Sequence, residues 1–554
     1  IHGTELWKTD GTSAGTQLVF DLNPGSQNSA FRLFSPGTVK FYFFQTVVQS
    51  NSTVFELWQS DGTLPGTIKV RDFPYVNGTS IPSFPSVIND VLYFSANDNG
   101  TGTKTWKSDG ALIGTIPIES FDTIAYTSFN GKIILKINGG QLAITDGTPF
   151  SAQLLSGTIV GNATIVDSNI YFMSTSLFKI DGIVFSAPQV IGTVGKVSMG
   201  SFDPLPVLNN RIFFPYNPSG SGFDTQELGV YDITNNSIAL LKEINPGSAG
   251  SQPTGFIILN DKILFKANDG TRGSEIWITD GTPEGTELLK DIRTGTEDSL
   301  SPFSLLSVVK DKNPIIANNQ LFINTLSPSS LFKVVGNDMQ SIYSGFIVPA
   351  PSLGALNDEP YYLDGFKVLK FNKETDQIQT LLDITSQANG ASINRVTLVA
   401  GNKLFFWFWP QSISGISSGF LNLGLEPWVT DGTPAGTHLL KDINPGTAGS
   451  VSVPAGSELN SNLIFAANDG TSGVELWLSD GAESGTHLIK DINPGAEGSI
   501  PREFGKLGTH VYFAANDGTH GTELWKSDGT QSGTVIVKDI FSGSSDSSPT
   551  NLVA

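Results

Sequence analysis

Short apolar runs, in which successive side chains alternate between the two sides of an extended strand, recur along the whole chain. In residues 510–515 the alternation places Val511 and Phe513 on one side of an extended strand. Residues 533–540 are rich in β-branched side chains, and Ser-Asp-Gly-Thr at 527–530 is a turn sequence in which Asp bonds its own backbone. No stretch shows a sustained helical period with caps. The pattern predicts an all-β chain with almost no helix.

These strands belong to a tandem repeat. Residues 263–295, 463–495 and 511–543 share the order A-N-D-G-T, E-(L/I)-W, D-G, G-T and K-D-I, and residues 3–25 join the same order midway. Following the Trp position through weaker copies gives about a dozen units of about 47 residues, each of which reads as four short strands.

Four strands in a unit of this length are typical of a β-propeller blade. Because a blade exposes two apolar faces, the recurring Trp is expected to fill the space between neighbouring blades. We therefore predict an all-β fold of tandem four-stranded blades that form one or more β-propellers. Since propellers usually carry ~4–8 blades, the simplest division is two rings, residues 1–252 with an incomplete first unit and residues 253–554. One large ring, an open array and unequal rings are the alternatives.

Both ends of the chain interrupt a unit. Ile1 stands just before strand three of its unit, and residues 548–554 resemble strand one of another. Either the two ends complete one blade together, or the sequence is a segment of a longer array. The absence of a strand two favours the segment.

The repeat resembles the ELWxxDGT repeat family. The strong copies carry the E-(L/I)-W and D-G motif, followed by G-T and K-D-I. The resemblance covers about two thirds of the chain, and residues 111–255 and 296–420 depart from it. The resemblance implies propeller-like repeats in large exported or surface proteins, mostly bacterial, with an extracellular or cell-surface location. It implies no catalytic residues. The motif positions of the last copy are Glu523, Leu524, Trp525, Asp528, Gly529 and Thr530.

Charge and composition narrow the partner classes. With 32 Lys and Arg against 52 Asp and Glu, the net charge of −20 argues against nucleic acid, which needs clustered basic residues. The same charge permits calcium as a cofactor without selecting it. The absence of Cys excludes disulfides and thiolate metal sites. No apolar run reaches the ~18 residues of a membrane-spanning helix, so no transmembrane segment is expected.

The loops of the A-N-D-G-T type are the candidate metal site. They are expected to share one face of the blade with the D-I-N-P-G connections, and oxygen donors gathered on one face suit Ca²⁺. The alternative is that Asn and Asp only cap tight turns. The candidate ligands are Asn268, Asp269, Asn468, Asp469, Asn516 and Asp517.

An aromatic stretch is the candidate ligand-binding site. Trp407 and Trp409 lie on one side of a predicted strand and could stack on sugar rings or anchor a partner. The alternative is that they pack between blades.

His438 and His487 occupy equivalent positions of successive copies, which indicates exposed strand positions and neither a zinc site nor a catalytic triad.

Singular catalytic motifs are absent from the sequence, because its carboxylates recur in every copy and no G-x-S-x-G or H-E-x-x-H occurs. We therefore expect no enzyme, but a non-enzymatic extracellular or cell-surface scaffold that associates with proteins, glycans or copies of itself. The alternatives are a calcium- or carbohydrate-binding, lectin-like module and a propeller hydrolase or lyase.

Overall fold

A computed structural model gives the architecture of the chain. It describes residues 5–552 except 23–29, 50–51, 76–81, 99–101, 121–122, 130, 138–140, 156–159, 182–187, 196–204, 218–224, 248, 293, 297–314, 318–319, 327–328, 345–353, 358, 365–366, 384–390, 411–423, 452–454 and 551.

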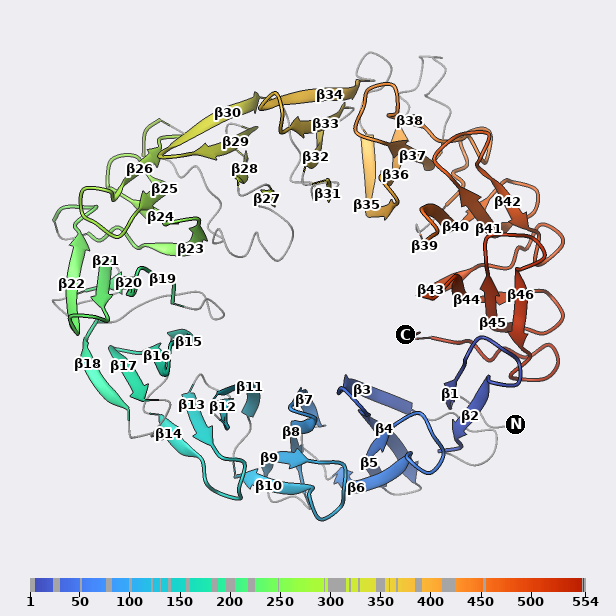
Figure 1. Cartoon of the computed structure of the whole chain (residues 1–554), viewed down its shortest axis with the longest axis horizontal. Helices are drawn as coiled ribbons and strands as arrows, with labels where there is room; N and C mark the ends of the chain where they lie inside the picture. Colours follow the sequence, from blue (N-terminus) through green and yellow to red (C-terminus); the bar gives the residue numbers. More distant parts are fainter. Residues whose placement is uncertain are drawn as a thin grey trace. The chain divides into compact units, whose positions relative to one another are not determined.

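The described residues form β-strands and turns and contain no helix, as the sequence predicted. Eleven sheets have four strands each in sequence order and one sheet has two strands, which gives the expected dozen units. The strand pairings that the structure describes are antiparallel, as between β4 and β5. Figure 1 labels each sheet's strands in turn. This is the strand order of a propeller blade, so the predicted fold class is confirmed.

The strands of the first half of the chain are β1 (Leu6–Lys8), β2 (Gln17–Phe20), β3 (Ala30–Pro36), β4 (Phe41–Gln49), β5 (Ser52–Ser60), β6 (Ile68–Tyr75), β7 (Ser83–Ile88), β8 (Val91–Asn97), β9 (Thr103–Ser108), β10 (Ile116–Glu119), β11 (Thr123–Phe129), β12 (Lys132–Ile137), β13 (Gln141–Thr145), β14 (Gln153–Leu155), β15 (Val160–Val166), β16 (Asn169–Met173), β17 (Ser176–Asp181), β18 (Gln189–Thr193), β19 (Val207–Leu208), β20 (Arg211–Tyr216), β21 (Glu227–Asp232) and β22 (Ser237–Lys242).

The strands of the second half are β23 (Thr254–Leu259), β24 (Lys262–Asn268), β25 (Ser274–Thr279), β26 (Glu287–Lys290), β27 (Ile315–Ala317), β28 (Gln320–Leu326), β29 (Ser329–Val335), β30 (Asp338–Ser344), β31 (Gly354–Leu356), β32 (Glu359–Asp364), β33 (Lys367–Asn372), β34 (Gln377–Asp383), β35 (Ala391–Ala400), β36 (Lys403–Pro410), β37 (Glu426–Thr430), β38 (His438–Leu439), β39 (Gly456–Leu459), β40 (Asn462–Asn468), β41 (Val474–Ser479), β42 (His487–Lys490), β43 (Arg502–Leu507), β44 (His510–Asn516), β45 (Thr522–Ser527) and β46 (Val535–Lys538).

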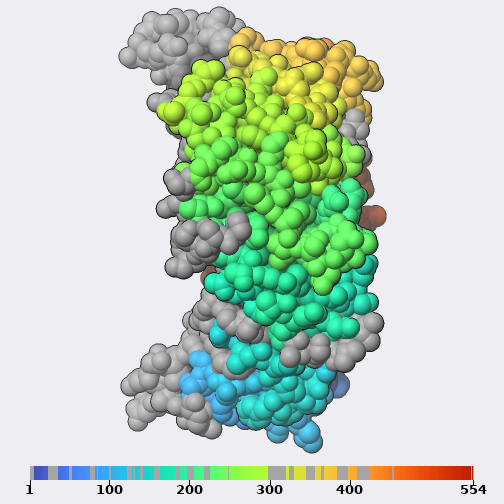
Figure 2. Space-filling model, turned by 90° about the vertical axis from the view of Figure 1, so that its left-hand side faces the viewer, coloured from blue at the N-terminus to red at the C-terminus, as the bar shows by residue number. Residues whose placement is uncertain are grey.

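The chain divides into two compact units. Unit 1 holds residues 1–8, 17–271 and 277–287, and unit 2 holds the remaining residues. The division runs through the sheet β23–β26, which begins directly after the boundary predicted between residues 252 and 253. The arrangement in two rings stays a prediction. In Figure 2 the sheets of unit 1, coloured from cyan to green, pack directly against one another.

The motif Trp is buried between neighbouring blades, as expected. Trp106 on β9 packs with Phe94 of its own blade and with Leu57 and Val70 of the preceding blade. In unit 2, Trp525 packs in the same way within a cluster that includes side chains of β40–β42. Burial of each ring on both sides removes roughly 150–250 Å² of aromatic surface from water, so adjacent blades stabilise one another.

Candidate functional site

In the strong copies, the turn between strands three and four is held by side-chain hydrogen bonds to its own backbone. In the turn after β5, Asp61 Oδ1 accepts hydrogen bonds from the backbone nitrogen of Thr63 at 2.8 Å and from its hydroxyl at 2.7 Å. These bonds favour the charged carboxylate and lower the pKa of Asp61. The Ser60 and Thr67 hydroxyls lie 2.7 Å apart and close the turn at its base.

The capping Asp restricts one position of this turn to glycine, because its carboxylate lies where a side chain would be. A Cβ atom added to Gly66 would lie 2.0 Å from Asp61 Oδ1, so a side chain at this position would have to displace the Asp61 carboxylate. Gly62 adopts a φ of +80°, a conformation that L side chains rarely adopt. Because the backbone is held in this way, residues 64 and 65 at the tip project away from the blade.

Three consecutive blades of unit 1 carry large apolar residues at these tips. Leu64 is 63% exposed, Leu112 62%, Ile113 91% and Phe150 65%. The equivalent tips of five other copies are Ser-Ala at 13–14, Pro-Glu at 283–284, Pro-Ala at 434–435, Glu-Ser at 483–484 and Gln-Ser at 531–532. We call residues 61–67, 109–115 and 146–152 the apolar turns.

Phe150 has an unusual backbone conformation for a bulky residue. Its φ is +56°, in the left-handed region, and its nitrogen donates a 2.7 Å hydrogen bond to the carbonyl of Ile118 in the preceding blade. The turn closes one residue earlier than its counterparts, because Ser151 instead of residue 152 bonds Thr145. The chain therefore holds an exposed aromatic ring in a strained conformation that costs on the order of 1–3 kcal/mol.

The apolar turns are neighbours across the blades of unit 1. The turn at 146–152 is bonded to β10 through the contact between Phe150 and Ile118. The turn at 109–115 accepts a hydrogen bond at the carbonyl of Thr115 from Arg71 on β6. Two further exposed side chains, Ile68 on β6 and Leu154 on β14, extend the apolar surface along the outer strands.

The predicted metal ligands lie where strand two ends and the loop to strand three begins, with each Asn at the end of the strand and each Asp in the loop, and each caps its own turn. Asn268, Asn468 and Asn516 each accept a 2.7 Å bond from a glycine nitrogen two residues later. Asp269 and Asp469 accept from the following Thr, and Asp469 also from Ser472. Burial opposes ionisation of Asp469, but these donors outweigh it and lower its pKa.

The third predicted pair has an additional partner. Asp517 accepts hydrogen bonds from the nitrogen of His520 at 2.7 Å and from that of Thr519 at 2.9 Å, and its second oxygen lies 2.6 Å from His520 Nδ1. Although burial acts in the opposite direction, these donors lower the pKa of Asp517 to about 2. Among the described residues, no group of three or more His, Asp or Glu side chains could hold a metal ion. The calcium site stays a prediction.

The Glu of the E-L-W motif anchors the connection to the next blade. Glu475 accepts hydrogen bonds from the nitrogens of Ile492, Asn493 and Ser499 at 3.0, 3.1 and 2.7 Å, and from the Ser499 hydroxyl at 2.6 Å. Burial raises the pKa of the equivalent Glu426 to about 7, although its donors act in the opposite direction, and the charge of Asp442 adds to the increase. This role of the Glu is structural.

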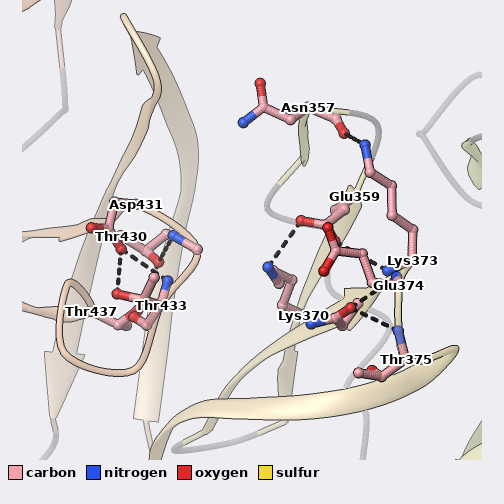
Figure 3. A network of polar contacts seen from close by, with 12 residues as sticks. Asn357, Glu359, Lys370, Lys373, Glu374, Thr375, Thr430, Asp431, Thr433 and Thr437 are labelled. Carbon is pink, nitrogen blue, oxygen red and sulfur yellow. Dashed lines mark hydrogen bonds and ion pairs between the residues drawn. The ribbon is translucent and has the colours of Figure 1, made fainter.

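A polar network in unit 2 departs from the repeat (Figure 3). Lys370 Nζ lies 2.9 Å from Glu359 Oε2, and the other oxygen of Glu359 accepts a 3.1 Å bond from the nitrogen of Lys373. Lys373 Nζ in turn donates to the carbonyl of Asn357 at 2.9 Å. Because each of these charged groups has a partner in the same sheet, the network ties β32 to β33 and the turn after it.

The two predicted ligand-binding tryptophans lie on β36. Trp407 is fully buried and packs with Phe405 and Phe465 in the core between neighbouring blades. Trp409 pairs with Ser392 in the sheet, and its side chain lies outside the described residues. His438 and His487 are in strand four of successive blades, at positions of intermediate and high exposure. A role of either Trp in binding stays a prediction.

The apolar turns are not among the sites predicted from the sequence. Their signal is present in the printed sequence, as Leu64-Pro65, Leu112-Ile113 and Pro149-Phe150 in three successive copies. Only the turn geometry shows that these side chains project into solvent, because apolar pairs of this kind could equally be buried between blades.

Comparisons with known proteins give likenesses of fold. No family model matches the chain, and no curated protein matches it. Among solved structures, BamB from Moraxella catarrhalis is 12% identical over 64% of this chain and 98% of that chain, with a TM-score of 0.31. PorZ, a bacterial surface component of the type-IX secretion system of Porphyromonas gingivalis, is 10% identical over 92% and 83% of the two chains, with a TM-score of 0.27. A GH74 enzyme from Niastella koreensis is 11% identical over 90% and 76%, with a TM-score of 0.22.

The prediction of a non-enzymatic scaffold is wrong. The similar structures include the GH74 enzyme, prolyl endopeptidases and an acylaminoacyl peptidase from Pyrococcus horikoshii, and nothing in the described residues shows a scaffold role. The physical reason is that repeated blades specify a fold, whereas function depends on the residues placed on it. The expectation that the chain is not an enzyme stays a prediction, as does the resemblance to the ELWxxDGT repeats.

The described residues include no helix with the length and apolar character needed to cross a bilayer.

Proposed function

We propose that the apolar turns of unit 1 form a recognition surface for a segment of another polypeptide. The observation that carries the proposal is the exposure of Leu64, Leu112, Ile113 and Phe150 on three consecutive turns. The turn backbone is built from the same Asp and Gly contacts in copies without large apolar tips, so folding does not require large apolar side chains there.

The energetic cost of this surface supports a binding role. Together with Ile68 and Leu154, the exposed side chains present on the order of several hundred Å² of apolar surface, the size at which exposed patches mark interaction sites. Phe150 adds backbone strain to exposure. Aromatic residues held rigidly at a surface are typical of residues that dominate binding energy.

The proposal names a protein as the partner and one surface of three blades as its site. It is therefore narrower than the scaffold prediction, which assigned association with proteins, glycans or copies of the chain. We also propose an extracellular or cell-surface setting, a location supported by the resemblance to the ELWxxDGT repeats.

Site-specific photo-crosslinking tests the proposal. A photoreactive amino acid replaces Ile113 in one variant of the full chain and Ser484, at the equivalent polar turn, in a matched control. After irradiation in the native sample, we expect the variant at 113 to give one discrete protein adduct that the variant at 484 does not give. Identical adduct patterns from the two positions, or no adduct at 113, would contradict the proposal.

A further inference from the structure

We infer that Asp480 and Asp109 are sites of spontaneous modification, at which the linkage between the Asp and the following Gly rearranges through a cyclic imide to isoaspartate. This chemistry is independent of the proposed function. Both residues lack a hydroxyl donor that the other described Asp-Gly turns have, and a lysine ammonium group contacts the main-chain carbonyl of each.

The side chain two residues after the Asp distinguishes these two turns. In the other described Asp-Gly turns a Thr at that position donates its hydroxyl hydrogen bond to the Asp carboxylate. These turns begin at Asp10, Asp61, Asp146, Asp269, Asp280, Asp431, Asp469, Asp517 and Asp528. Ala111 and Ala482 take the place of the Thr, and only their backbone nitrogens donate to the carboxylates of Asp109 and Asp480, at 2.9 and 2.8 Å.

The Thr hydroxyl protects an Asp from ring closure. The reaction requires the neutral carboxyl group, because an oxygen of the charged carboxylate is a poor leaving group. At Asp61 and Asp528 the hydrogen bond from the Thr hydroxyl is the largest cause of a lowered pKa, since it stabilises the charged form. An Ala at the same position removes this protection from Asp109 and Asp480.

A lysine contacts the peptide group that takes part in the reaction. Lys403 Nζ donates a 2.6 Å hydrogen bond to the main-chain carbonyl of Asp480, and Lys40 Nζ makes the same contact with the carbonyl of Asp109. The nitrogen of this peptide group, which belongs to the Gly, is the nucleophile. A cation on the carbonyl oxygen withdraws electrons from that nitrogen and makes its N–H more acidic, and it stabilises the negative charge on the oxygen when water attacks.

Two turns that contain the Thr place the cation one residue further along. Lys526 donates to the carbonyl of Gly11 at 2.5 Å, and Arg211 donates to the carbonyl of Gly281 at 2.8 Å. That oxygen belongs to the peptide bond after the Gly, which takes no part in ring closure. The two turns without the hydroxyl are thus also turns in which the cation lies on the reacting peptide.

The rearrangement needs no reactant besides water, which reaches Asp480 and Asp109 because both are exposed. The Gly481 nitrogen forms a bond to Cγ of Asp480, and one carboxyl oxygen leaves as water with the carboxyl proton and the amide proton. Water then adds to the main-chain carbonyl carbon of Asp480, and the bond from that carbon to the Gly481 nitrogen breaks. The chain now runs through Cγ, and the former main-chain carbonyl is a free carboxylate.

Peptide mapping of the full chain after prolonged incubation at neutral pH tests this inference. Isoaspartate peptides keep their mass and are identified by their retention and fragmentation. Asp528 is the internal control, because the Gly nitrogen donates a 3.0 Å bond to a Ser hydroxyl in its turn and in that of Asp480. Ala482→Thr adds the hydroxyl and Lys403→Met removes the cation, and a parallel incubation in urea removes the folded contacts.

We expect isoaspartate to accumulate at Asp480 and Asp109 about tenfold faster than at Asp528, the effect of one hydrogen bond to a charged group. Ala482→Thr and Lys403→Met should each slow the reaction at Asp480 and leave Asp109 unchanged. In urea, Asp480 and Asp528 should react at similar rates. Equal accumulation at Asp480 and Asp528 in the folded chain, a difference that persists in urea, no isoaspartate at Asp480, or a rate there that neither substitution changes overturns the inference.

Discussion

The ammonium group of Lys490 donates a hydrogen bond to the carbonyl oxygen of Thr534 in the next blade at a distance of 2.8 Å. The same ammonium lies 5.5 Å from the ring centroid of Trp525. The contact recurs within each unit, where the equivalent basic residue reaches the same carbonyl of the following turn. These pairs are Arg71–Thr115, Lys242–Thr286, Lys441–Thr486 and Lys538–Thr16. The Lys of K-D-I is thus an inter-blade link.

Replacing Lys490 by Met tests this link. The variant loses the bond to the buried Thr534 carbonyl and the cation–π contact with Trp525, which together stabilise the chain by about 1–3 kcal/mol. Urea unfolding followed by Trp fluorescence should show this loss. Lys490→Arg should retain most of the stability, because Arg71 makes the equivalent contact in unit 1. Equal losses of stability in the Met and Arg variants would show that the positive charge is not the source of the stabilisation.

Glu426 gives the stability of the chain a dependence on pH. Its pKa is raised from 4.5 to about 7 in the folded protein, so the folded state holds a proton that the unfolded state releases. The contribution is complete below pH 4.5 and is lost as the pH rises towards 7. Relative to Glu426→Gln, the unfolding free energy should fall by about 2 kcal/mol between pH 5 and pH 7.

Asp431 of the same blade is the matched control for this titration. Although burial acts in the opposite direction, the hydrogen bonds from Thr433 lower its pKa, so Asp431 stays charged throughout that range. The stability difference between the unchanged chain and Asp431→Asn should therefore be the same at pH 5 and pH 7. A parallel pH dependence in the unchanged chain and in Glu426→Gln would remove Glu426 as the source.

The effect of the backbone strain at Phe150 on stability can be measured separately from the effect of its ring. Phe150→Gly relieves the positive φ, whereas Phe150→Ala keeps the strain and removes the ring in the same way. The Gly variant should be about 1 kcal/mol more stable than the Ala variant in thermal unfolding. A Gly variant that is less stable than the Ala variant would contradict the assigned strain.

The fixed glycine of the turn can be tested by coupling it to its Asp. A Cβ at residue 533 would lie 2.0 Å from Asp528 Oδ1, so Gly533→Ala must displace the cap and should cost about 1–3 kcal/mol. In an Asp528→Ala background the same change should cost much less, because the obstructing carboxylate is gone. Additive losses in a double-mutant cycle would contradict this explanation.

Much of the fold could be predicted from the sequence because the same pattern of strands and turns recurs from copy to copy. The spacing of Trp58 and Trp106 gave the length of a blade, and the alternation around Phe513 gave the strands. Burial of Trp525 between blades follows from its size. The turn role of Asp528 follows from its local sequence, Ser-Asp-Gly-Thr.

Other features depend on contacts between distant residues and could not be predicted. Glu475 and Ser499 are 24 residues apart, and no local pattern indicates that a buried carboxylate holds the connection between blades. The direction of the Leu112 and Phe150 side chains is set by the turn and by the preceding blade. The scaffold prediction failed for a different reason, since repetition carries information about packing and none about ligands.

Hydroxyl-radical footprinting of the full chain, purified and in its native sample, tests the central claim most directly, because it reports whether the apolar turns are covered where the protein works. The account predicts that Leu64, Leu112, Ile113 and Phe150 are labelled in the purified chain and protected in the native sample, whereas Val190 and Val535, exposed apolar residues on outer strands, are labelled equally in both. Equal labelling of the apolar turns in the two samples would contradict it.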